Sequence, residues 1–179
     1  MVIDDGILPS VHAALADIPD PELPCSIVDL GLVEAVTVDE DGHVDITLLP
    51  TFTGCPALDM IANDVTRLVG NLDAVESCRV HWVFDPPWST DRITEAGRTL
   101  LKAHGVTVPT CGGEPASRGV EFRTTAIACP WCGSHETRLD SPFGPTRCRT
   151  IQYCESCKNT FEDMKRLDHE DEASSPGAG

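Results

Sequence analysis

The sequence is poor in basic residues and contains no long hydrophobic segment. Of its 179 residues, 13 are lysine or arginine and 29 are aspartate or glutamate, which gives a formal net charge of -16 at pH 7. Nucleic-acid binding needs a basic surface, so no nucleic-acid partner is expected. No apolar run approaches the roughly 18 residues of a membrane span, so no membrane association is expected either.

A basic N-terminal region of the kind found in secretory signals is also missing, since Met1-Val-Ile-Asp-Asp5 carries acids instead. We therefore expect a cytoplasmic protein. Nine cysteines stand against this background. In a compartment that keeps thiols reduced, they indicate metal ligands or reactive thiols rather than disulfides.

The hydrophobic pattern predicts an α+β domain over residues 1–105, with helices packed on a small mixed sheet. The Asp41-Gly42 pair lies between two β-rich segments and predicts a hairpin. The expected elements are a helix at 10–18, strands at 33–38 and 44–49, a helix at 56–72, a strand at 77–84 and a helix at 91–104.

A change in charge balance near residue 123 predicts a second unit. Residues 1–123 contain 7 basic and 20 acidic side chains, whereas residues 124–167 contain 6 and 5. Residues 106–123, with their prolines and glycines, are expected to form a linker. Residues 168–179 are expected to be a disordered acidic tail. The segment 124–167 is then a small β-rich module.

Two Cys-x-x-Cys pairs lie in this module, Cys129/Cys132 and Cys154/Cys157, with 21 residues between them. Each pair places two thiolates on one side of a tight turn, and two such turns complete the tetrahedron that Zn²⁺ prefers. Metal binding contributes on the order of 10 kcal/mol to the folding of such modules. We therefore predict a structural zinc ribbon. A redox dithiol, or an iron–sulfur cluster on the same thiolates, is the alternative.

Two other cysteines have open roles. Cys148 lies within the module and Cys111 in the expected linker. Each is interpreted either as an additional ligand or as an unligated thiol.

A further cysteine lies where the second strand meets the second helix, in Thr51-Phe-Thr-Gly-Cys55-Pro56. Proline fits the first helical position, which places Cys55 at or next to the N-cap. Unpaired amides and the helix dipole would lower the pKa of a thiol there and favour the thiolate. Thr51 and Thr53 would add hydroxyl donors. The alternative is a small buried cap residue.

Little in the sequence supports hydrolytic chemistry at Cys55, because no histidine lies close to it in sequence to act as a base. Asp29 is a candidate hard ligand, although an acid in this position also suits the ordering of the proline-rich loop that begins at Pro19. The sequence also lacks a nucleotide-binding loop and a Glu-x-x-His di-iron motif.

Several motifs together resemble known families. Asp20-Pro-Glu-Leu-Pro-Cys-Ser-Ile-Val-Asp-Leu-Gly31 and Pro50-Thr-Phe-Thr-Gly-Cys-Pro-Ala57 resemble the small α+β domain of the iron–sulfur assembly family that includes SufT-like proteins. Asp85-Pro-Pro-Trp-Ser-Thr-Asp91 continues the match. With the Cys-Pro-x-Cys-Gly-Ser module appended, residues 9–166 are similar to the PaaD family, whose members are components of phenylacetyl-CoA epoxidase complexes.

This resemblance implies an accessory protein of aerobic phenylacetate breakdown that has no catalytic activity of its own. It would assist assembly of iron–sulfur or di-iron centres in the oxygenase or its iron–sulfur reductase. Cys55 would hold iron or a cluster transiently, alone or across a homodimer interface, and the two cysteine pairs would hold the ribbon metal. The alternative is a structural or regulatory subunit of the oxygenase complex with a purely structural zinc.

The sequence departs from the family pattern at two positions. Pro145 stands where relatives have serine, and Arg166 follows Lys165 where relatives have cysteine. The second change removes a potential extra ligand, whereas neither change affects Cys55 or the cysteine pairs.

Overall fold

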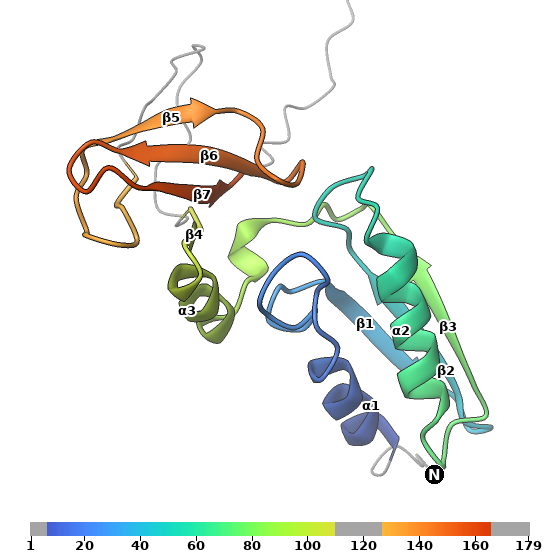
Figure 1. Ribbon diagram of the computed structural model, residues 1–179. Helices are drawn as coiled ribbons and strands as arrows, with labels where there is room; N and C mark the ends of the chain where they lie inside the picture. The colour runs from blue at the N-terminus through green and yellow to red at the C-terminus, as the bar shows by residue number, and fades with distance from the viewer. Residues whose placement is uncertain (1–6, 110–126, 166–179) are drawn as a thin grey trace, which may run out of the picture.

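The computed structural model describes residues 7–109 and 127–165 and consists of two modules that meet at α3 and β4 (Figure 1). One module is a sheet with helices packed on it, and the other is the sheet that contains the two cysteine pairs. The elements are α1 (Ile7–Ala16), β1 (Val33–Val38), β2 (His43–Leu48), α2 (Leu58–Gly70), β3 (Ser77–Trp82), the short 3-10 helix η1 (Thr90–Arg92), α3 (Glu95–Ala103), β4 (Val106–Thr107), β5 (Thr137–Ser141), β6 (Arg149–Cys154) and β7 (Thr160–Met164).

The first module confirms the predicted α+β class and its element order. Strands β1 and β2 form the antiparallel hairpin expected at Asp41-Gly42, and Gly42 has the positive φ of 83° that this turn requires. Strand β3 returns after α2 and pairs in parallel with β2, which makes the three-stranded sheet mixed. Helices α1 and α2 contact each other and the sheet, so they cover one face (Figure 1).

The core of this module follows the two periodicities of the sequence. Alternate residues of β2 are buried, and the residues of α2 that face them recur every four positions. Together with α1 they exclude water from the centre of the module. The buried residues of these three elements are Val11, Leu15, Val44, Ile46, Leu48, Ile61, Val65 and Val69.

Two helix boundaries differ from the sequence prediction. Helix α2 begins at Leu58 because Pro56 and Ala57 form a turn. The helix expected at 91–104 is interrupted, because Thr94 has extended backbone angles and its Oγ1 accepts a hydrogen bond from the backbone N–H of Gly97 at 3.0 Å. This N-cap starts α3 at Glu95 and leaves η1 as a separate turn.

The second module is a four-stranded sheet in the order β4-β7-β6-β5. Its strand β4 comes from the start of the segment that the sequence assigned to a linker, because Val106–Thr107 pairs in parallel with β7. Val106 and Met164 are also buried in the main hydrophobic core. The two modules therefore share both a strand pairing and part of one core. Most of the expected linker and the whole expected tail lie outside the described residues.

A glycine determines how closely the modules approach. Gly105 follows α3 with a positive φ of 76°, and a Cβ built on it would overlap the indole of Trp131. The indole Nε1 donates to the backbone carbonyl of Thr160 at 3.2 Å, and the carbonyl of Gly105 accepts from Glu162 N at 2.9 Å. The first cysteine pair, which contains Trp131, is thereby held against the end of α3.

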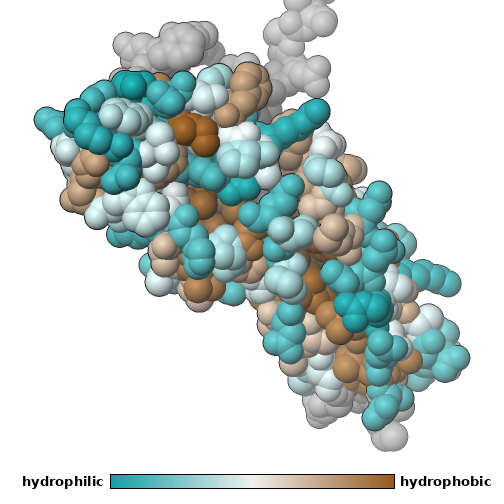
Figure 2. Space-filling view, viewed as in Figure 1, coloured by the Kyte–Doolittle hydropathy of each residue, from teal (hydrophilic) through white to brown (hydrophobic). Residues whose placement is uncertain are grey.

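Hydrophilic side chains cover most of the face shown in Figure 2, and hydrophobic residues appear in separate areas that include the junction of the modules. Within residues 7–109 and 127–165, no helix combines the length and the apolar character needed to cross a membrane.

Substitution of Gly105 by alanine tests this junction. We expect Gly105→Ala to lower the free energy of unfolding by about 2–4 kcal/mol, because the residue has a left-handed conformation and the added methyl displaces Trp131. Gly70→Ala is the control, since nothing lies within 4 Å of a Cβ there, and it should change stability by less than about 1 kcal/mol. Chemical denaturation measures both. Equal stability of the two variants would contradict the tight junction.

Candidate metal centre

The two cysteine pairs have the same backbone conformation. In the first turn Gly133 N donates to the carbonyl of Cys129, and in the second Lys158 N donates to the carbonyl of Cys154, both at 2.9 Å. Gly133 and Lys158 also have similar positive φ angles, 74° and 63°. These turns aim both thiols of each pair to the same side, which is the arrangement that the Cys-x-x-Cys spacing predicted.

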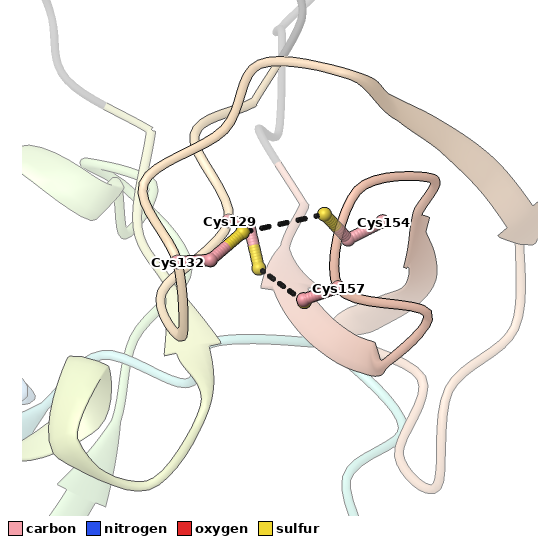
Figure 3. A group of neighbouring side chains, drawn as sticks. All are labelled: Cys129, Cys132, Cys154 and Cys157. Atoms are coloured by element: carbon pink, nitrogen blue, oxygen red, sulfur yellow. Dashed lines mark hydrogen bonds between the residues drawn. The ribbon is translucent and has the colours of Figure 1, made fainter.

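The four thiols face one another (Figure 3). The Sγ atoms of Cys129 and Cys157 lie 3.7 Å apart, those of Cys132 and Cys154 lie 3.6 Å apart, and all four lie within 4.8 Å of one another. Four sulfurs at ~2.3 Å from one ion in a tetrahedron lie about 3.8 Å apart. The donor set therefore fits one tetrahedral, thiophilic ion.

Backbone amides near the cluster favour a thiolate on the second pair. Hydrogen bonds from the backbone and side chain of Asn159 lower the pKa of Cys157 to about 6. The backbone N–H of Ser134 also lowers the pKa of Cys132, but burial and hydrogen bonds to the other three thiols raise it to about 12. The thiols thus share protons in a way that a cation would replace.

The cluster is also part of a small hydrophobic core. Cys129 and Cys154 are buried and pack with Phe161, whereas Cys157 is half-buried and Cys132 is exposed. A metal ion here would hold the two turns together where the strands contribute few apolar side chains. Cys148 is distant from this cluster. It precedes β6, whereas Cys154 ends that strand, so the two are roughly 20 Å apart at ~3.3 Å per residue.

The Cys55 loop contains the other candidate cysteine. Cys55 is half-buried two residues before the N-cap residue Ala57, and its N–H donates to the carbonyl of Phe52 at 3.2 Å. It lines a cavity of about 190 Å³ that opens between the two modules. Glu22, Phe52, Cys55 and Pro56 form one wall, and residues 145–148 of the second module form the other.

The electrostatic expectation for Cys55 is wrong. Burial raises the pKa of this thiol above its ordinary value, and the hydrogen bond from the backbone N–H of Ala57 only partly offsets that effect. The charges of Glu22 and Asp20 raise it further. The sequence suggested a lowered pKa because it places the cysteine near a helix N-terminus, but α2 starts later and the nearby acids lie in a distant segment.

The predicted supporting residues have different positions. Cys148 lines the cavity opposite Cys55, and its Sγ lies 3.1 Å from Thr146 Oγ1. Thr51 is half-buried and Thr53 is exposed, and neither is among the residues that line the cavity. Cys111 lies outside the described residues.

Asp29 has structural partners in both of its carboxylate oxygens. Oδ1 accepts from Thr94 Oγ1 at 2.7 Å and Oδ2 from Ser26 Oγ at 3.0 Å. Its backbone carbonyl accepts from Thr94 N, so it ties the loop before β1 to the start of α3. Asp20 has a similar place in its own loop, because its Oδ1 accepts from Glu22 N and Leu23 N at 2.8 and 2.9 Å.

The sequence does not reveal the second wall of the cavity. It indicates a role for Glu22 only in the proline-rich loop, and it gives no signal for Arg147. No local pattern joins residue 22 to residue 147, because they meet only through the packing of the two modules. A group of Asp39, Asp41 and His43 also lies together, but it is exposed, and Oδ1 of Asp39 accepts backbone N–H groups of the hairpin turn.

The fold and these sites define a class: an iron–sulfur assembly type of α+β domain joined to a four-cysteine β ribbon. The family model described as "Iron-sulfur cluster assembly protein" matches residues 9–82, and that of the "PaaD zinc beta ribbon domain" matches residues 113–165. A protein of Escherichia coli (strain K12), assigned by name as a component of 1,2-phenylacetyl-CoA epoxidase, is 35% identical over 88% of this chain and 93% of its own. The chain belongs to the PaaD family.

Other relatives match the first module. The Fe-S protein maturation auxiliary factor YitW of Bacillus subtilis (strain 168) is 35% identical over 55% of this chain and 97% of its own length. The crystal structure of a domain of unknown function, DUF59, from Bacillus anthracis has a TM-score of 0.50 and 37% identity over 52% of this chain and 89% of its own. The first module thus also occurs without the ribbon.

Loss of one ribbon thiol tests the metal centre. We expect the purified protein to contain one metal ion per chain and Cys154→Ser to lose it, because three thiolates and a hydroxyl hold such an ion poorly. Amide hydrogen exchange should then accelerate in β6 and β7, while α2 stays protected. Cys78→Ser in β3 is the control and should keep the ion. A full equivalent of metal in Cys154→Ser would contradict the assignment.

Proposed function

We propose that this protein is an accessory factor that assists assembly of an iron–sulfur or di-iron centre in a phenylacetyl-CoA epoxidase and has no catalytic activity of its own. Its client would be the oxygenase or the iron–sulfur reductase of that complex. The observation that carries this proposal is the half-buried Cys55 at an open cavity, in a domain that also makes up nearly the whole of a named Fe-S maturation factor.

The chemistry of the cavity supports a holding role. Its walls contain two thiols, one carboxylate and one guanidinium, and none of the described residues that line it is a histidine. Hydrolytic catalysis at a cysteine needs a base oriented toward the sulfur. A thiol beside a carboxylate without such a base suits the reversible binding of a thiophilic cation.

We further propose that the ribbon metal is zinc and that its role is structural. The four thiols are arranged for one ion, and two of them are buried in the ribbon's own core. Closed sites of four cysteines leave no open coordination position for a substrate. The reduced state of all four thiols fits a protein that works in the cytoplasm.

Cys55→Ser tests the proposed function when it is co-expressed with the epoxidase components. We expect the variant to fold and keep its ribbon ion, while the iron content of the purified oxygenase or reductase falls several-fold, because the transient ligand is gone. Metal analysis of the client and its epoxidase activity measure the effect. Cys78→Ser, another half-buried cysteine, should leave client iron unchanged.

A purely structural component of the oxygenase complex would behave differently. It would co-purify with the oxygenase in fixed stoichiometry, and Cys55→Ser would leave the client's iron at its normal level. That result would overturn the maturation role.

A further inference from the structure

The loop that contains Cys55 faces a loop of the second module. A Cβ on Gly54 would lie 3.7 Å from Nη1 of Arg147, so the two loops are in van der Waals reach. Figure 1 shows the connection between β5 and β6 approaching the loop that precedes α2. Cys55 and Cys148 line the same cavity, one from each side.

A buried arginine next to Cys148 holds its turn in place. Arg149 is 6% exposed, its Nε donates to Thr146 Oγ1 at 2.8 Å, and its Nη1 lies 2.5 Å from Oε2 of Glu162. The backbone N–H of Gly144 donates to the carbonyl of Arg149, and Lys165 N donates to the carbonyl of Cys148, both at 2.9 Å. These bonds fix the turn on both sides of Cys148 and leave its thiol at the cavity.

The charges around the cavity favour a cation. Glu22 and Arg147 both line it and offset each other. Two thiolates would then leave a local excess of two negative charges, which one divalent ion neutralises. A partly buried site that reaches neutrality on binding avoids the cost of an uncompensated charge.

We propose that Cys55 and Cys148 together bind one thiophilic divalent cation, ferrous iron in the context of the proposed function on which this inference rests. Each thiol gives its proton to solvent, so one ion bound through two sulfurs releases two protons and involves no change of oxidation state. The remaining coordination positions stay open to Glu22, water or a client's ligand. The second thiolate comes from the same chain, so no homodimer is needed to supply it.

Metal titration of the zinc-loaded protein without oxygen tests this site. Co²⁺ is the first probe, because thiolate-to-cobalt charge-transfer absorbance reports sulfur ligation, and Fe²⁺ is the second. Zinc is measured before and after, to verify that the ribbon stays filled. We expect one additional ion per chain, and an affinity at least about ten-fold lower in Cys55→Ser and in Cys148→Ser.

Two further variants complete the titration. Cys148→His should recover much of the binding, since imidazole also ligates these ions. Cys78→Ser should bind as the unchanged protein does. Unchanged affinity in Cys148→Ser, or one additional ion per two chains whether or not Cys148 is present, would overturn the two-thiol site.

Co-expression with the client separates this inference from the function beneath it. Reduced client iron in both Cys55→Ser and Cys148→Ser supports the shared site. Reduced iron in Cys55→Ser alone overturns the role of Cys148 and leaves the maturation function standing. Normal iron in both overturns the maturation function, and the titration alone then decides whether the two thiols bind an ion.

Discussion

The contact between Gly105 and Trp131 determines the geometry of the whole molecule. The chain enters the second sheet directly after α3, and β4 has only two residues with which to pair to β7. So short a pairing does not fix an orientation by itself. The indole against a glycine without Cβ, its hydrogen bond to Thr160, and the burial of Met164 in the main core supply the rest. The ribbon is therefore packed onto the domain.

This packing gives the two ends of β6 different chemistry. Cys154 at one end belongs to the four-thiol cluster, and Cys148 at the other end lines the cavity beside Cys55. The ion pair of Arg149 and Glu162 joins β6 to β7 near the second end. An ion in the cluster would order the sheet, and the ordered sheet would hold Cys148 across from Cys55. A structural ion and an exchangeable one can then coexist in one small protein because a strand separates them.

Local rules account for what the sequence predicted correctly. Periodic apolar residues gave α2 and β2, the Asp-Gly pair gave the hairpin, and the Cys-x-x-Cys spacing brought four thiols together, since each signal acts over a few residues. The errors have non-local causes. The pKa of Cys55 is raised because acids from residues 20 and 22 and the ribbon loop surround it. The role of Gly105 was visible only as a C-cap, because Trp131 meets it through tertiary packing.

The two thiol sites differ in how firmly they would hold an ion. In the ribbon, Asn159 offers hydrogen bonds that favour a thiolate on Cys157, and four sulfurs close the coordination sphere. At the cavity, burial and acidic neighbours favour the protonated form of Cys55, with Ala57 as the opposing backbone donor. A proton that competes with the ion, together with an incomplete set of sulfur ligands, weakens binding and leaves positions for an incoming ligand. Weak, open ligation is what a carrier requires, because an ion held as tightly as the ribbon's would never reach a client.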